Sequence, residues 1–194
     1  MYCFVNDFLS EEQVDNIISA GEQSQLELAK VESNGEFIVD KEVRSVQRSF
    51  LNLENETEWV NDHFYELAKS VKFLFKSQYD ISLDISGGLE KNSGVPCINY
   101  LVYNDSDHYD WHKDRSLGVE NEEVNKRSLS TTVQLSGPEE YEGGELVLRL
   151  GDEEITVPKQ KGLCCTFLSK DIFHKVNAVT SGTRRALVAW NLSG

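Results

Sequence analysis

The sequence predicts an α+β chain in which two helices precede a run of short strands that close as a sandwich or jelly roll. Apolar residues recur at helical spacing in two stretches of residues 1–78. From Tyr79 onward the pattern changes to about eight short, β-rich segments spaced roughly ten residues apart. Turn sequences such as Ser86-Gly87-Gly88 and Glu142-Gly143-Gly144 separate these segments. We therefore expect one domain over 1–194, with helical support and flanking strands at 1–78 and the jelly-roll core at 79–194.

The first helix is expected over about 10–29. Ser10 and Gln13 are spaced as a capping box, and acidic residues occupy the first turn, where the helix dipole favours negative charge. The second helix is expected over roughly 56–77. Its apolar side carries Trp59, Phe64, Leu67, Ala68, Val71, Leu74 and Phe75. A stripe of this kind indicates a helix that packs on a core.

Short strands account for most of the rest of the chain. Between the helices we expect strands at 36–40 and 43–53. After the second helix the expected strands are 80–86, 97–104, 109–114, 128–136, 144–150, 153–158, 163–168, 173–179 and 184–191. Residues 117–123 are the stretch nearest to a disordered segment, interpreted either as a solvated loop or as a mobile lid beside a site.

The composition is that of an ordinary folded protein with a strong negative charge. Hydrophobic side chains make up 39% of the 194 residues, and the formal net charge is −14. Because such a surface repels phosphate, we expect neither a nucleic-acid partner nor an anionic membrane. No apolar run approaches the roughly 20 residues that span a bilayer, and the first residues show no secretory signal.

The four cysteines are Cys3, Cys97, Cys164 and Cys165, and they include no Cys-x-x-Cys pair. Reduced, buried thiols and a cytoplasmic location are expected. The adjacent Cys164 and Cys165 should point to opposite faces of one strand.

A His-x-Asp sequence at His112 and Asp114 is the first candidate for a functional site. In a strand, side chains two residues apart leave on the same face, with Cα atoms about 6.5 Å apart, so both can hold one metal ion. A second strand-like segment supplies His174. Two histidines and one carboxylate with open positions form the facial triad of non-haem Fe(II) oxygenases. However, His108 and Asp110 form a second His-x-Asp, and the pattern alone does not choose between them.

An oxygenase of this type also needs a group that holds the distal carboxylate of 2-oxoglutarate, and a guanidinium suits that task. Arg184 follows His174 by ten residues, after a turn that would fold the next strand back toward the metal. Its neighbour Arg185 would point to the opposite face and is interpreted as a surface charge. Tyr103 offers a phenol to the same carboxylate, although taken alone it is typical of a core aromatic.

Several ordered segments carry a resemblance to a known family. They are Asp7-Phe8-Leu9-Ser10, Tyr103 and Tyr109 before His112-Lys113-Asp114, the stretches 127–136, 141–146 and 157–167, and His174 through 182–184 to Trp190. Together they resemble the Fe(II)/2-oxoglutarate-dependent dioxygenases of the prolyl 4-hydroxylase superfamily, in particular the bacterial PKHD-type hydroxylases. The likeness spans most of the chain. It implies a double-stranded β-helix, a cupin-like jelly roll with supporting N-terminal helices.

The resemblance also implies the roles of individual residues. The implied iron ligands are His112, Asp114 and His174, because Tyr103 then falls nine residues upstream of His112, which favours this register over His108 and Asp110. The implied 2-oxoglutarate contacts are Arg184, Tyr103 and Thr132. The implied activity is hydroxylation of a peptidyl residue, with prolyl 4-hydroxylation favoured, while 2-oxoglutarate and O2 are consumed and succinate and CO2 are released. Ascorbate is left open as a further cofactor.

The substrate is the least constrained part of this hypothesis. Candidate contacts, chosen for their position near the metal or in the early strands, are Trp111, Arg115, His108, Arg44 and Arg48. A protein or peptide substrate, with proline as one candidate, is expected. The alternatives are the same chemistry on a free amino acid or other small molecule, and a jelly-roll binding module without turnover. A nucleic-acid demethylase is disfavoured by the acidic charge.

Overall fold

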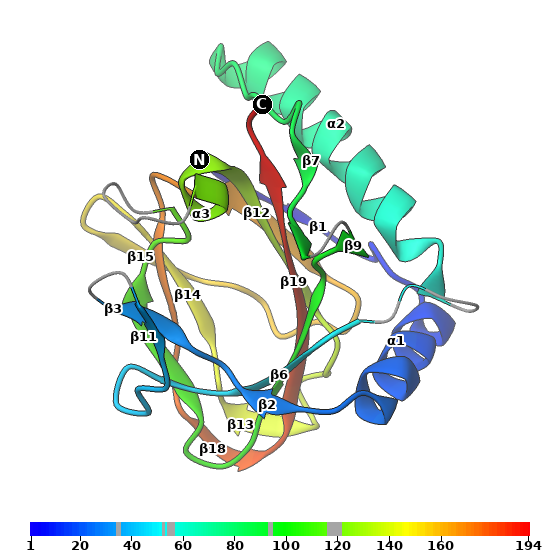
Figure 1. The fold of residues 1–194 in the computed structure, drawn as a ribbon, viewed down its shortest axis with the longest axis vertical. Helices are drawn as coiled ribbons and strands as arrows, with labels where there is room; N and C mark the ends of the chain where they lie inside the picture. Colours follow the sequence, from blue (N-terminus) through cyan, green and yellow to red (C-terminus); the bar gives the residue numbers. More distant parts are fainter. Residues whose placement is uncertain (34–35, 52, 54–56, 93–94, 116–121) are drawn as a thin grey trace.

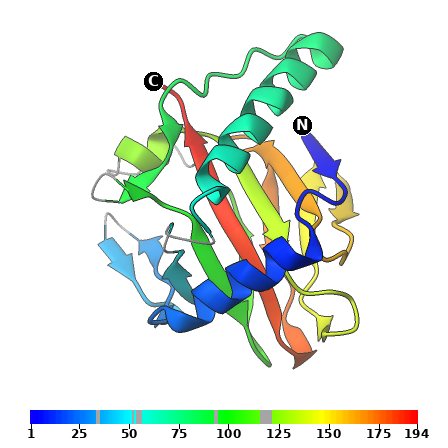
Figure 2. The same cartoon turned by 90° about the vertical axis from the view of Figure 1, so that its right-hand side faces the viewer.

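Two antiparallel sheets face each other, and two helices cover the outer side of the larger sheet (Figures 1 and 2). The computed structural model describes residues 1–33, 36–51, 53, 57–92, 95–115 and 122–194. The prediction of an α+β chain with N-terminal helices and a jelly-roll arrangement of strands is confirmed.

The larger sheet has eight strands, and its central strand is β19. Its path runs through β1 (Tyr2–Val5), β16 (Cys164–Leu168), β12 (Arg127–Gln134), β19 (Arg184–Leu192), β10 (Asn99–Tyr103), β6 (Gln47–Phe50) and β2 (Glu27–Leu28), and β7 (Gly88–Leu89) also pairs with β19. Neighbours in the sheet are far apart in the chain, as jelly-roll connections require.

The smaller sheet has five strands and carries most of the candidate site. Its order is β15 (Glu153–Thr156), β14 (Leu146–Leu150), β17 (Phe173–Val176), β11 (His108–His112) and β5 (Arg44–Ser45). Three two-stranded pairs complete the β-structure: β13 (Tyr141–Gly143) with β18 (Val179–Gly182), β3 (Val31–Ser33) with β4 (Glu36–Ile38), and β8 (Lys91–Asn92) with β9 (Val95–Pro96).

Strand alternation divides the hydrophobic side chains between two cores. On β10, Tyr100 and Val102 join the core under the helices, whereas Leu101 and Tyr103 join the core between the sheets. The adjacent cysteines divide in the same way, Cys164 under the helices and Cys165 between the sheets, which confirms that they point to opposite faces. All four cysteines are free.

The helices differ from their predicted bounds at their ends. Helix α1 (Glu11–Gln23) has the predicted capping box but stops six residues early, because Ser24 turns to an extended backbone and its hydroxyl bonds the Ala20 carbonyl. Helix α2 (Val60–Tyr79) ends at Asp80, a left-handed residue whose N–H bonds the Lys76 carbonyl. A short third helix, α3 (Glu122–Lys126), begins in the last two residues of the predicted loop 117–123, of which 117–121 lie outside the described residues. Within the described part of the chain, no helix combines the length and the apolar character that crossing a bilayer requires.

Several strand predictions also need correction. The strand predicted at 80–86 is wrong, because that segment follows the cap of α2 and packs Leu83 and Ile85 under the helices instead of pairing. The strand predicted at 43–53 is broken into β5 and β6, which belong to different sheets. The strand predicted at 173–179 is divided in the structure: β17 ends at Val176, and β18 begins at Val179. The strand predicted at 109–114 corresponds to β11, which ends at His112, so Asp114 lies two residues after the strand.

Candidate metal and anion site

His112 and His174 are brought together by the pairing of β11 with β17. They are direct partners in the antiparallel register, and their ring centroids lie 4.0 Å apart. The register shifts between Tyr109 and His112, so these two residues, three apart in sequence, stand on the same side and their rings stack at 3.5 Å. A bulge of this kind re-aims side chains that a straight strand would alternate.

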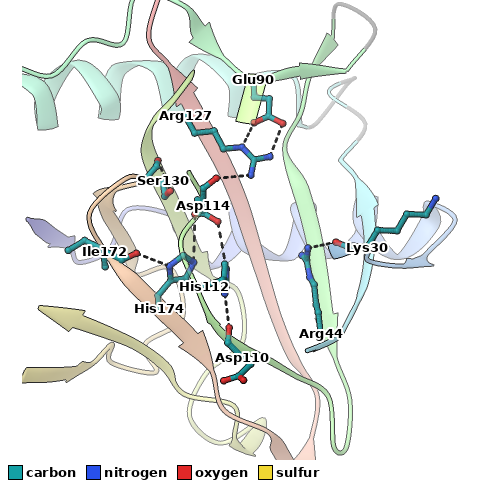
Figure 3. Close-up of polar contacts among 11 residues, drawn as sticks. Lys30, Arg44, Glu90, Asp110, His112, Asp114, Arg127, Ser130, Ile172 and His174 are labelled. Carbon is teal, nitrogen blue, oxygen red and sulfur yellow. Dashed lines mark hydrogen bonds and ion pairs between the residues drawn. The ribbon is translucent and has the colours of Figure 1, made fainter. Parts of the chain in front are cut away.

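Asp114 completes a cluster of three potential ligands. One carboxylate oxygen lies 3.7 Å from Nε2 of His112 and the other lies 3.7 Å from Nε2 of His174 (Figure 3). One ligand atom from each of the three residues lies within 4.8 Å of the others. Atoms that bind one metal ion at roughly 2.1 Å lie about 3–4 Å from one another, so this donor set fits a metal ion after a small closing movement.

The orientation of both imidazoles is set by backbone carbonyls. Nδ1 of His112 lies 2.8 Å from the Asp110 carbonyl oxygen, and Nδ1 of His174 lies 3.4 Å from that of Ile172. A carbonyl accepts a proton only, so each Nδ1 is the donor and each Nε2 keeps its lone pair toward Asp114. Outer hydrogen bonds of this kind fix the tautomer of metal-binding histidines.

The protonation states also suit a divalent metal. Burial lowers the pKa of both histidines, and the neighbouring His174 lowers that of His112 further. Burial alone would raise the pKa of Asp114, but His174, His112 and Arg127 together lower it below its usual value. Two neutral nitrogens and one carboxylate are therefore available.

A buried ion pair holds the backbone at Asp114. Arg127 donates from Nη1 to the Asp114 carbonyl oxygen at 3.3 Å. Its Nε and Nη2 bond the two carboxylate oxygens of Glu90 at 2.6 and 2.9 Å, and its guanidinium lies 3.7 Å from the Trp190 ring centroid. Glu90 had no signal in the sequence, because its partner is 37 residues away.

The triad opens into a cavity of about 720 Å³ whose wall also contains Arg184, Tyr103 and Thr132. Arg184 and Tyr103 are direct partners of β19 and β10, and the guanidinium lies 5.0 Å from the Tyr103 ring centroid. Gly182 has φ +77, at a position where a side chain would strike the Glu140 carbonyl, but it is the last residue of strand β18, so the turn predicted before Arg184 is wrong. Arg185 points the other way and bonds Glu22 of α1.

Arg184 is a buried cation without an anionic partner among the described residues. It is 1% exposed, and Nη2 donates to Gln134 Oε1 at 2.9 Å. Its Nε and the nearby Tyr141 hydroxyl have no hydrogen-bond partner in the described part of the chain. Because an unpaired buried charge is costly, the arrangement fits an anionic ligand such as a carboxylate. Sequence reasoning missed Gln134, although its position two residues after Thr132 on β12 was an available signal.

The predicted substrate contacts around the metal pair lie elsewhere. Trp111 is on the outer side of the small sheet, where the Arg149 guanidinium lies 3.9 Å and the Lys175 ammonium 4.8 Å from its ring centroid. His108 bonds the carbonyls of Ser106 and Glu42. Neither these residues nor Arg115 is in the cavity wall, whereas Arg44 and Arg48 are.

Comparison with known proteins agrees with this geometry. Residues 98–191 match the family model described as the 2OG-Fe(II) oxygenase superfamily. A PKHD-type hydroxylase of Shewanella frigidimarina is 38% identical over 110 residues, which are 55% of this chain and 46% of that protein. One of Alteromonas mediterranea is 37% identical over 108 residues, again 55% of this chain and 46% of the relative. The matched region thus spans about half the length of these curated relatives.

Solved structures show the same fold. A Pseudomonas putida prolyl-4-hydroxylase has a TM-score of 0.71 at 17% identity, with 100% of this chain and 92% of that chain covered. A Trichoplax adhaerens prolyl hydroxylase, solved with a peptide fragment of hypoxia inducible factor, has a TM-score of 0.73 at 13% identity, covering 99% and 83%. The family and the triad imply Fe(II) and 2-oxoglutarate as cofactors. The part of the chain that carries the His-x-Asp…His cluster at the pairing of β11 and β17 thus matches the 2OG-Fe(II) oxygenase superfamily.

Proposed function

We propose that this chain is a dioxygenase that hydroxylates a peptidyl residue, with a prolyl ring as the favoured target. The observation that carries the enzymatic part is a three-ligand cluster and an unpaired buried guanidinium in the wall of one cavity. The prolyl part is supported by the relatives named PKHD-type hydroxylases and by prolyl hydroxylases among the similar folds.

In this proposal His112, Asp114 and His174 would hold Fe(II) at the wall of the cavity. Arg184 binds the distal carboxylate of 2-oxoglutarate, and Tyr103 and Thr132 line the same part of the wall. Burial raises the pKa of Tyr103, more than Arg184 lowers it, so its hydroxyl stays protonated and can donate to that carboxylate.

When bound, iron and 2-oxoglutarate supply the oxidant: one atom of O2 enters succinate, the other enters the product hydroxyl, and one carboxyl carbon leaves as CO2. The contribution of the chain is to position and shield. Carbonyls of Asp110 and Ile172 hold the two imidazoles in the metal-binding tautomer. Leu101, Leu146 and Val176 give the cavity an apolar wall that limits access of water to the reacting atoms.

The test is succinate formation by the full chain with Fe(II), 2-oxoglutarate and ascorbate. We expect slow succinate release without substrate, stimulation by proline-containing peptides, and a gain of one oxygen atom in the peptide mass. Stimulation by free amino acids but not by peptides would replace the peptidyl target with a small molecule. A complete lack of succinate under all conditions would contradict the enzymatic proposal and favour a binding module.

The anchor of 2-oxoglutarate can be tested with two adjacent arginines. Replacing Arg184 with Met should raise the concentration of 2-oxoglutarate needed for half-maximal succinate formation by roughly tenfold to a hundredfold, because a charge-assisted bond is lost. Arg185→Met removes an arginine that faces α1 and pairs with Glu22, and this concentration should stay within about twofold. Equal effects of both variants would contradict the assignment.

A further inference from the structure

The wall of the cavity is cationic although the chain is strongly acidic. Its described lining includes seven lysine and arginine side chains and three carboxylates, whereas the formal net charge of the chain is −14. Concentrating the minority charge in one cavity focuses a positive potential there. The positive potential of the cavity therefore favours an anionic ligand.

The two cofactors do not account for all of this charge. Arg127 and Arg48 are paired with Glu90 and Glu27. Asp114 and Arg184 have the roles proposed above toward Fe(II) and 2-oxoglutarate. The charges of Asp114, Arg184, the dianionic 2-oxoglutarate and Fe(II) are −1, +1, −2 and +2, so these four groups together are neutral. Four cations of the wall then remain without a carboxylate partner among the described residues, namely Arg44, Lys30, Lys91 and Lys113, and Arg44 is the arginine among them.

Arg44 is held beside the metal ligands by an aromatic layer. Its guanidinium lies 4.4 Å from the centroid of the Tyr109 ring, and that ring stacks at 3.5 Å on His112. Nη1 donates to the Lys30 carbonyl at 3.2 Å, the contact drawn in Figure 3. These contacts fix the guanidinium plane instead of leaving it on a flexible stem.

The unsatisfied donors of the wall indicate what such a ligand must accept. Arg44, Arg48 and Arg184 each have a buried Nε–H without a hydrogen-bond partner in the described part of the chain, and so does Nε1 of Trp190. All four side chains line the cavity. A buried N–H left unpaired is destabilising, and a ligand oxygen that accepts its hydrogen bond would remove that cost.

We propose that the substrate carries a carboxylate of its own and that Arg44 binds it near the mouth of the cavity, which the partly exposed Val43 and Phe50 mark. A carboxylate is favoured because Nη1 is already bonded, and the remaining Nε edge suits a planar, bidentate partner. The proposal rests on the proposed function. The carboxylate comes either from a free acid or from an acidic side chain of a peptide, and the experiment separates these two sources.

The experiment uses the full chain loaded with Mn(II) in place of iron and saturated with 2-oxoglutarate, so that Arg184 is occupied. Two pairs of probes are titrated, and the relaxation of their methyl or methylene protons by Mn(II) reports binding near the metal. N-acetylglycine and its amide represent a free carboxylate. N-acetyl-aspartate and N-acetyl-asparagine methylamides represent a side chain in a peptide.

In at least one pair we expect the carboxylate to bind roughly tenfold or more tightly than its amide. Arg44→Gln should reduce this preference to below about threefold, and Arg44→Lys should retain part of it. The matched control is Arg149→Gln, which should keep the full preference. Arg149 lies over the ring of Trp111 on β11 and is not part of the cavity wall.

Equal binding of acid and amide in both pairs would overturn the proposal, and so would a preference that persists in Arg44→Gln. If Arg44 had a purely structural role, acting through Tyr109 on His112, its replacement would instead weaken Mn(II) binding. It would also weaken binding of the acid and of the amide in each pair alike. Because the relaxation measurement needs no turnover, failure of the proposed function would appear separately, as absence of succinate formation by the Fe(II) protein.

Discussion

Strand β11 and the two residues after it contain the same His-x-Asp sequence twice, at His108/Asp110 and at His112/Asp114. The first pair faces solvent and backbone: His108 bonds two carbonyl oxygens, and the Asp110 carboxylate accepts the Trp111 N–H. The second pair meets His174 in the wall of the cavity. Identical residues four positions apart thus have different surroundings.

The difference comes from the backbone between the two pairs. On a straight strand all four side chains would share one face, but the register shift between Tyr109 and His112 separates them. The first pair also lies opposite β5, while the second lies opposite β17, which carries the remaining histidine. Neighbouring strands, and not the motif itself, decide which pair can hold a metal.

The largest expected effect distinguishes the two histidines directly. His174→Ala removes one of three ligands and should weaken Fe(II) binding by more than the roughly 100-fold that loss of an outer-shell partner costs. His108→Ala should leave the affinity within about twofold, because no ligand atom depends on it. Titration with Fe(II) under anaerobic conditions measures both. Loss of iron in His108→Ala would show that the first pair is the metal site.

The next effect concerns the ion pair that only the second motif contacts. Glu90→Gln leaves the largely buried Arg127 without its charge partner, and breaking such a pair typically costs about 3–5 kcal/mol of unfolding free energy. Replacing both residues, as Glu90→Gln with Arg127→Met, should cost less than the sum of the single changes. Urea denaturation of the four proteins completes the cycle. Additive losses would mean that the two side chains do not stabilise each other.

Two aromatic residues of β11 provide a smaller contrast. Tyr109 stacks on His112, so Tyr109→Leu should weaken metal binding about threefold to tenfold, the value of an aromatic contact. Trp111 lies on the other side of the sheet between Arg149 and Lys175, and Trp111→Leu should change metal affinity less than about twofold. The same metal titration separates them. A larger effect at Trp111 would place that side chain at the site, as the sequence had suggested.

The jelly roll was predictable because its longer strands are short β-rich runs separated by turn residues. The β-rich runs of β10, β12 and β19 and the turn glycines, such as Gly151 between β14 and β15, are visible in the sequence. The break between β5 and β6 was not, because the chain stays extended there and only its partners change. The error at 80–86 has a similar cause: Leu83 and Ile85 are buried by packing under the helices, and burial alone does not distinguish a strand from an extended loop.

For the site, residues with a chemical motif were easier to find than residues that only support it. His112, Asp114, His174 and Arg184 stand out because their side chains are ligands or isolated cations. Glu90 and Gln134 were missed, since the importance of each lies in its long-range hydrogen bonding to a single arginine, Arg127 and Arg184 respectively. Trp111 was chosen for its place next to His112, but the bulge turned Tyr109 toward the cavity instead.

The smallest effect is the pH dependence that His108 of the first motif contributes. Nδ1 and Nε2 of His108 both face carbonyl oxygens, at 3.1 and 3.0 Å, and only the doubly protonated ring can donate to both. The Glu42 carbonyl accordingly raises the pKa of His108, against a smaller opposing effect of burial. A raised pKa in the folded state stabilises the fold fully at pH values below the unfolded pKa near 6.5, and this stabilisation is lost as pH rises through the folded pKa.

His108→Gln should therefore lower the unfolding free energy at pH 5.5, by about 1 kcal/mol or less because the ring is partly exposed, and have less effect at pH 8.5. Urea denaturation of both proteins at the two pH values measures this difference, and an equal loss at both would mean that the His108 ring is neutral in the folded protein.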